Sequence, residues 1–275
     1  LAIATAAGSA GQVFGAPLVE YLLSFMTWQQ TFMVFAGVIL SVLMVLPMMR
    51  SPITATKAEL QETMGATLKR AFKDPSYSLI FLGFFSCGYQ LAFITAHFPA
   101  LVTEMSGPIA QGSWLAGFGI TTTSALGAIA ISLIGLANIG GTLFAGYLGK
   151  RYSKKYLLAG IYTGRTIIAA AFIMMPITPT TVVIFSICMG SLWLATVPLT
   201  SGLVAHLYGL RYMGTLYGIV FFSHQLGSFL GVWLGGALYD IYGTYTYVWW
   251  VGVGVSAFSA IIHLPIKENR PAVTA

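Results

Sequence analysis

Charged residues are scarce in this chain. Asp, Glu, Lys and Arg make up 7% of its 275 residues, whereas soluble domains carry about 25%. A soluble fold of this length could not cover its surface with so few charges. Apolar residues make up 57% of the chain instead, and the mean hydropathy is +0.84. The scarcity of charge excludes an ordinary soluble domain and predicts a chain surrounded by lipid.

Cysteine is also scarce, and the motifs of several functional classes are missing. Cys87 and Cys188 lie inside apolar stretches, which predicts two buried thiols rather than a disulfide framework. The four histidines have no metal-ligand spacing, so we expect no metal and no cofactor. The absence of a GxxxxGKS or GxxxxGKT loop argues against a nucleotide-driven pump. The apolar segments hold no paired carboxylates or nucleophile motif, which argues against a membrane-embedded enzyme.

Eight apolar segments are long enough to cross a membrane, since about 20 residues span the hydrocarbon core. They cover residues 1–24, 27–49, 76–101, 124–148, 156–176, 180–206, 213–239 and 246–266. The sequence therefore predicts an all-α membrane protein with eight transmembrane helices. The chain begins inside the first segment without Met or a basic leader, and we interpret it as a fragment that lacks its N-terminal part.

Basic residues are concentrated in alternate connections between these segments. Twelve of the 13 are Arg50, Lys57, Lys69, Arg70, Lys73, Lys150, Arg151, Lys154, Lys155, Arg211, Lys267 and Arg270. If all eight segments cross, these residues share one side, which the positive-inside rule assigns to the cytoplasm. Both ends then lie in the cytoplasm, and we expect a multi-pass protein of the cell (inner) membrane. Because the charge is in loops rather than on one folded surface, nucleic acid is not an expected partner.

The longest polar stretch, residues 50–75, is the only candidate linker, and residues 57–72 within it could form an amphipathic surface helix.

The first and the last helical hairpin of the chain resemble each other in sequence. One starts with Gly11 and Gly15 and the other with Gly227 and Gly231, and both end in Leu-Pro. Such repeats mark the halves of transporters. We expect residues 1–49 to be the last two helices of one half and residues 76–275 to hold a complete six-helix half.

The stretch GYLGKRYSKK at residues 146–155 carries a family resemblance. It is similar to the G-x-L-x-D-R-x-G-R-K signature of the major facilitator superfamily, and the matching residues are Gly146, Leu148, Arg151 and Lys155. Lys150 replaces the signature Asp and Ser153 the second Gly. The resemblance implies that the eight segments are helices 5 to 12 of that fold. It also implies that Gly146, Arg151 and Lys155 belong to a conformational gate.

Two further stretches resemble bacterial monocarboxylate and oxalate/formate transporters within that superfamily. They are GFFSCGYQLAFITAHFPALV and SLIGLANIGGTLFAGYLGKRYSKKYLLAGIY. Proton-coupled members have an Asp and an Arg four residues apart in helix 8, where this chain has Asn138 and Thr142. A lactate-type proton relay is therefore not expected at these two positions. The first segment also contains GSAGQVFGAP, which resembles a glycine motif of antiporters.

Polar side chains at membrane depth are candidate site residues because burying them in lipid is costly. Arg165 lies about 14 Å into its segment at 1.5 Å per residue. It could attract a substrate carboxylate or form an inner gate, or else clamp carbonyls or an ion-pair partner. His224 and Gln225 interrupt an apolar segment near its middle. They could bind solute, or His224 could be hydrogen-bonded to a neighbouring helix.

Gln90, His97 and Asn138 complete the candidate binding residues. Gln90 and His97 are seven residues apart on one helical face, which suggests a solute path or, alternatively, interhelical hydrogen bonds. Asn138 occupies the position of the family's acidic residue and could equally join helices.

These observations favour a secondary transporter that moves a small organic anion, similar to a monocarboxylate, by alternating access. Its partners would be that solute, a coupling ion such as H⁺ and the lipid bilayer. An efflux antiporter for an amphipathic compound is the alternative, and a membrane enzyme or a non-transporting sensor is more remote.

Overall fold

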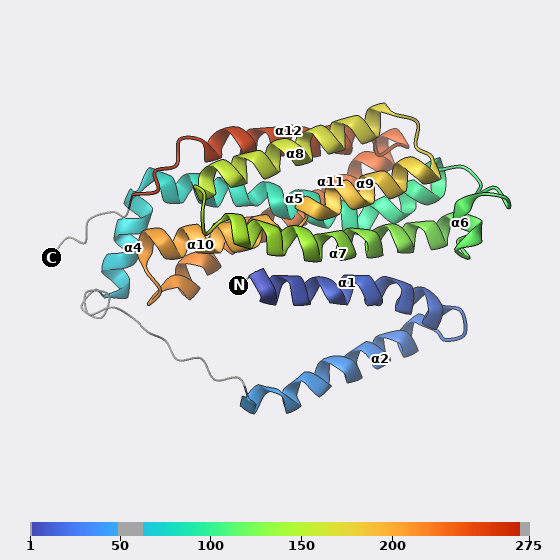
Figure 1. Cartoon of the computed structure of the whole chain (residues 1–275), viewed down its shortest axis with the longest axis horizontal. Helices are drawn as coiled ribbons and strands as arrows, with labels where there is room; N and C mark the ends of the chain where they lie inside the picture. Colours follow the sequence, from blue (N-terminus) through green and yellow to red (C-terminus); the bar gives the residue numbers. More distant parts are fainter. Residues whose placement is uncertain (1, 49–62, 270–275) are drawn as a thin grey trace.

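The computed structural model describes residues 2–48 and 63–269, and every regular element within them is helical. Most helices lie side by side in one bundle, while α4 and the short α6 lie at its opposite ends (Figure 1). The long elements are α1 (Ala2–Leu23), α2 (Trp28–Ser41), α5 (Pro75–Met105), α7 (Thr123–Leu148), α8 (Lys154–Met174), α9 (Pro179–Leu192), α10 (Thr196–Tyr208), α11 (Met213–Tyr242) and α12 (Thr246–His263). The short ones are α4 (Met64–Lys73), α6 (Trp114–Gly117) and two 3-10 turns, Val42–Met44 and Leu46–Met48.

Seven stretches of the described residues are long and apolar enough to cross a membrane: α1, α5, α7, α8, α9 with α10, α11 and α12. The eighth predicted segment, 27–49, forms a shorter apolar helix over Trp28–Met44. The all-α prediction is confirmed. The predicted segment 180–206 is one of the seven stretches, but its helix is interrupted between α9 and α10.

The predicted separation of charge is visible in the bundle. Within the described ranges, every Lys and Arg except Arg165 lies at the end of the bundle where α4 is found (Figure 1). The turns that follow α7 and α10 and the end of the described chain lie there too. The two ends of the bundle therefore differ in charge as a bilayer requires, and the cytoplasmic side remains a prediction.

A helix forms over α4 within the stretch predicted to be an amphipathic surface helix, and its position on the membrane surface stays a prediction. Residues 57–62 of that prediction lie outside the described residues. Thr63 caps α4 by accepting a hydrogen bond from the Ala66 amide at 3.3 Å. Asp74 then caps α5, accepting from the Ser76 amide at 2.8 Å. The other oxygen of Asp74 accepts a hydrogen bond from the Tyr208 hydroxyl at 2.7 Å, which ties the start of α5 to the end of α10.

Glycines allow the central helices of the bundle to approach closely. A Cβ atom built on Gly88 of α5 would overlap the backbone carbonyl of His224 on α11. Gly227 and Gly231 of α11 face the backbone of α5 in the same way. Small residues at such contacts let helix backbones touch in a membrane. The α5–α11 contact therefore fixes His224 against the middle of α5.

The N-terminal hairpin joins the bundle through α1. Helix α1 runs along α7, whereas α2 diverges from the bundle (Figure 1). Ser124 of α7 donates a hydrogen bond to Glu20 of α1 at 3.2 Å near one end of this contact. Near the other end, Gly146 of α7 faces Ala2. The two helices are therefore antiparallel and touch over their whole length.

One cysteine prediction was wrong. Cys87 is buried, but Cys188 is exposed on the surface of α9. A small thiol behaves as a weak hydrophobe, so an outward-facing position on an apolar helix is compatible with lipid.

The glycine contact between α5 and α11 can be tested by Gly227→Ala. We expect this variant to unfold at a lower temperature, because overpacking costs about 1–3 kcal/mol. Gly218→Ala is the matched control, since no heavy atom lies within 4 Å of a Cβ atom at Gly218 on the same helix. Thermal unfolding in detergent measures both variants. Equal midpoints for the two variants would contradict the packing described here.

Candidate functional site

Helices α9 and α10 are separated by a break at residues 193–195. Pro198 in the first turn of α10 accounts for it, because a proline has no N–H to donate and its ring clashes with the carbonyl four residues earlier, here Leu194. A break at membrane depth exposes backbone groups that lipid cannot satisfy. The surrounding side chains satisfy them, and two of these side chains are predicted site residues.

Arg165 donates hydrogen bonds to backbone carbonyls in and next to the break. Its side chain on α8 is 1% exposed, and Nε and Nη2 donate to the Leu192 carbonyl at 3.2 and 2.9 Å. Nη2 also donates to the Trp193 carbonyl. The geometry matches the carbonyl clamp that the sequence left open. Nη1 is buried with no hydrogen-bond partner among the described residues, so the donors at one end of the guanidinium are unused.

Asn138 accepts a hydrogen bond from a backbone amide in the same break. Its side chain on α7 is fully buried, and Oδ1 accepts hydrogen bonds from the Leu194 amide at 2.8 Å and the Thr142 hydroxyl at 2.9 Å. Nδ2 donates to the Ser9 hydroxyl of α1 at 2.6 Å. Asn138 and Thr142 are therefore a neutral hydrogen-bonded pair.

A small polar cluster surrounds Arg165, which we call the Arg165 cluster: Arg165, Tyr162, Cys87 and Thr196. The Cys87 sulfur lies 3.9 Å from Nη2 of Arg165 and 3.3 Å from the Thr196 hydroxyl. The guanidinium carbon lies 5.4 Å from the centre of the Tyr162 ring. The Tyr162 hydroxyl is buried and, like Nη1 of Arg165, lacks a partner among the described residues. Helices α5, α8 and α10 all contribute to this cluster.

His224 extends the cluster from α11. Its ring stacks on Phe221 with centroids 4.9 Å apart and lies against Phe84 with centroids 5.2 Å apart. Nδ1 lies 3.3 Å from Oε1 of Gln225 and 3.5 Å from the Ser228 hydroxyl. His224 is buried, whereas Gln225 is exposed on the bundle surface. The backbone of His224 packs against Gly88, the residue next to Cys87, so His224 lies beside the Arg165 cluster, whereas Gln225 lies at the edge.

Gln90 and His97 lie at other helix contacts. Nε2 of Gln90 donates to the Gly252 carbonyl of α12 at 3.4 Å, and its Oε1 has no partner within the described chain. Nε2 of His97 donates to the Val232 carbonyl of α11 at 3.0 Å. The two side chains thus join α5 to different neighbours. This arrangement favours interhelical hydrogen bonding over the predicted solute path.

The signature loop lies at the basic end of the bundle. Arg151 covers the Tyr147 ring, with its guanidinium carbon 4.8 Å from the ring centre. The Lys155 amide donates to Oε1 of Glu268 at 2.7 Å, and its ammonium donates to the Leu264 carbonyl at 3.2 Å. These contacts join the start of α8 to the segment that follows α12.

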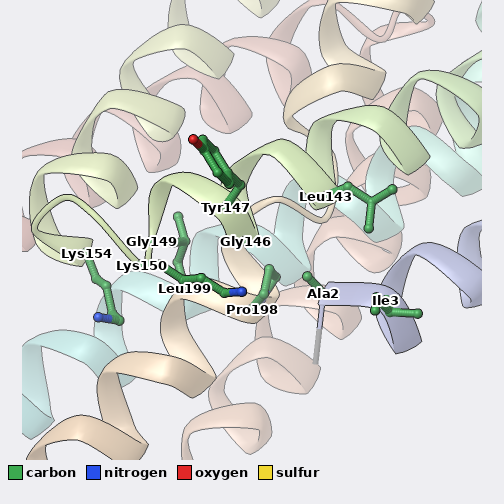
Figure 2. Close-up of a pocket in the computed structure, with 10 residues that line it drawn as sticks. All are labelled: Ala2, Ile3, Leu143, Gly146, Tyr147, Gly149, Lys150, Lys154, Pro198 and Leu199. Carbon is green, nitrogen blue, oxygen red and sulfur yellow. The ribbon is translucent and has the colours of Figure 1, made fainter.

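A cleft of about 450 Å³ opens at the same end, between α1, α7 and α10 (Figure 2). Its lining residues are Ala2, Ile3, Leu143, Gly146, Tyr147, Gly149, Lys150, Lys154, Pro198 and Leu199. Gly146 is the only predicted site residue among them, and it belongs to the signature loop. Lys150 and Lys154 make the cleft basic. The cleft reaches Pro198 just after the break, but no residue of the Arg165 cluster lines it.

Sequence reasoning missed Cys87, Thr196 and Tyr162 as members of the cluster, and it missed the helix break. Pro198 was the available signal for the break. Cys87 and Tyr162 carried none, because each looks like an ordinary apolar residue until the fold places it beside Arg165. Within residues 2–48 and 63–269, no group of three His, Cys, Asp or Glu side chains could hold a metal ion.

Comparison with known proteins agrees with this fold. A family model described as "Major Facilitator Superfamily" matches residues 1–232. YcxA of Bacillus subtilis, described as an uncharacterized MFS-type transporter, is 26% identical over 290 residues covering 99% of this chain and 65% of YcxA. YceJ of the same organism, described in the same words, is 27% identical over 65% of this chain and 41% of YceJ.

Two solved structures have a fold similar to that of this chain. The Escherichia coli fucose:proton symporter FucP has a TM-score of 0.57 at 14% identity, covering 89% of this chain and 60% of FucP. A second structure, titled as FucP in the outward conformation, has a TM-score of 0.58 at 15% identity, covering 89% of this chain and 59% of that one. The chain thus spans less than two thirds of the length of each of these proteins.

The role of Arg165 in holding the break can be tested by Arg165→Met. We expect a clear loss of thermal stability, because each buried carbonyl left without a donor costs about 1–3 kcal/mol. Arg151→Met is the matched control at the surface, where substitutions usually change stability by about 0.5 kcal/mol or less. Unfolding midpoints in detergent measure both. A midpoint for Arg165→Met at or above the control value would show that the break does not depend on this side chain.

Proposed function

Because the chain belongs to the major facilitator superfamily, we propose that it is a secondary transporter that moves a small organic anion by alternating access. The observation that carries the anionic substrate is the buried guanidinium of Arg165. The binding groups are Nη1 of Arg165, the Tyr162 hydroxyl and the Thr196 hydroxyl, with the imidazole of His224 beside them. The membrane is the bacterial inner membrane, with the basic end of the bundle in the cytoplasm.

The charge balance around Arg165 supports an anion. The described acidic residues are Glu20, Asp74, Glu104, Asp240 and Glu268, all of them at or near helix ends. None of them pairs with Arg165, whose described partners are carbonyls and the Cys87 sulfur. A buried cation without a counter-ion is costly, and carbonyl dipoles offset only part of that cost. A substrate carboxylate at Nη1 would supply the missing charge.

The basic mouth of the cleft supports the same sign of charge. Lys150 and Lys154 border the cleft of about 450 Å³ (Figure 2), a volume within the usual range for small-molecule sites. Cations that line a cleft raise the local concentration of anions. In this proposal the two lysines attract the solute, and the Arg165 cluster binds it.

The coupling ion in this proposal is H⁺. FucP, which shares the fold, is named a fucose:proton symporter. Asn138 and Thr142 are neutral here, so a relay at the Asp and Arg positions of proton-coupled monocarboxylate carriers is not part of the mechanism. Of the groups beside the cluster, His224 is the one whose unperturbed pKa falls near neutral pH. It is therefore the proposed proton carrier within the described residues.

The test is uptake by the complete gene product in proteoliposomes. We expect labelled lactate, pyruvate or oxalate to accumulate when an inward proton gradient is imposed. Arg165→Gln should raise KM for the anion at least about tenfold, since a hydrogen bond to a charged group contributes about 1.5–3 kcal/mol. Arg165→Lys, which keeps the charge, should recover part of the affinity.

Cys188→Ser is the control, because this residue is exposed on α9 away from the cluster. Protein amounts are normalised to the folded fraction, so that lost stability is not mistaken for lost binding. Unchanged KM in Arg165→Gln would overturn the anion site. No uptake of any carboxylate together with export of an amphipathic dye would instead establish the efflux alternative.

A further inference from the structure

Asn138 connects three parts of the fold. Its Nδ2 donates to Ser9 on α1, and its Oδ1 accepts from Thr142 on its own helix and from the Leu194 amide in the break. The hydroxyl of Ser9 in turn donates to the Thr5 carbonyl of α1 at 3.1 Å. A continuous chain of hydrogen bonds therefore runs from α1 through α7 to the break between α9 and α10.

The orientation of the Asn138 amide depends on all of these partners. An amide oxygen has two lone pairs, and both are used here. The amide nitrogen reaches α1, and Asn138 is fully buried, so a nitrogen that lost Ser9 would have no water to replace it. An unsatisfied buried donor is expensive. The amide would rotate to find another acceptor, and that rotation would carry Oδ1 away from Leu194.

Two side chains bind the backbone of the break, and of these Asn138 also contacts α1. Arg165 binds the carbonyls of Leu192 and Trp193 from α8. Asn138 binds the amide of Leu194 from α7. A displacement of α1 therefore acts on the break first through Asn138, which contacts both Ser9 and Leu194.

We propose that Asn138 is a latch that keeps the α9–α10 break in its present shape only while Ser9 of α1 is in contact with it. When α1 moves against α7, the bond to Ser9 breaks, the amide of Leu194 is released, and the carbonyls bound by Arg165 can shift. Asn138 is thus a positioning residue. It links movement of the N-terminal hairpin to the geometry of the Arg165 cluster.

The latch has an internal control in a second polar link between the same helices. Ser124 of α7 donates to Glu20 of α1 but has no described hydrogen bond to the break. Ser9→Ala and Ser124→Ala each remove one hydrogen bond between α1 and α7. Only Ser9→Ala is expected to disturb Leu194.

The test is hydrogen–deuterium exchange of the complete gene product in lipid nanodiscs, followed by mass spectrometry of peptides that contain Leu194. We expect Ser9→Ala to speed exchange of the Leu194 amide about 2- to 10-fold, the factor for one hydrogen bond. Ser124→Ala should exchange at the wild-type rate. Asn138→Ala should exchange at least as fast as Ser9→Ala.

Each other outcome contradicts the latch. Fast exchange in Asn138→Ala with a wild-type rate in Ser9→Ala would make Asn138 a fixed support of the break, independent of α1. Equal acceleration in both serine variants would indicate general loosening of the α1–α7 contact. A wild-type rate in Asn138→Ala would remove it from the break. The latch proposal rests on the proposed transport cycle. Because hydrogen–deuterium exchange is measured without substrate, a failure of the latch proposal is distinct from a failure of the anion proposal.

Discussion

Lipid cannot hydrogen-bond a backbone, and the arrangement of this fold follows from that constraint. Continuous helices satisfy their own peptide groups, so most of the bundle needs only apolar side chains and close packing. The break between α9 and α10 is the exception. Its carbonyls and amide are satisfied by Arg165 and Asn138, two of the most buried polar residues in the described chain. The costly groups at membrane depth are therefore located where the backbone is irregular.

Hydropathy and charge alone were enough to predict most of the architecture. The apolar segments correspond to helices with ends that differ by a few residues, because length and the positions of Lys and Arg are local properties of the sequence. The break was missed because segment 180–206 is apolar throughout, and hydropathy does not detect one interrupted turn. Pro198 marked it, but a proline within an apolar segment is tolerated in many membrane helices.

The candidate site was predictable only in part, for a different reason. A polar residue at membrane depth can be recognised from the sequence, but its partner cannot. Arg165 lies against Cys87, next to the Gly88 on which His224 packs, whereas Gln90 and His97 each reach a backbone carbonyl on another helix. The partners of Gln90 and His97 are more than 130 residues away in the chain. Periodicity identifies the face of a helix and leaves open which helix covers it.

The glycine contact between α5 and α11 also divides the bundle mechanically. The backbones of α5 and α11 touch without intervening side chains, so neither helix can slide or tilt against the other without collision. Cys87 and His224 lie on this pair of helices. Arg165, Tyr162 and Thr196 lie outside it, on α8 and α10. The dimensions of the cluster are therefore set by how α8 and α10 lie relative to α5 and α11.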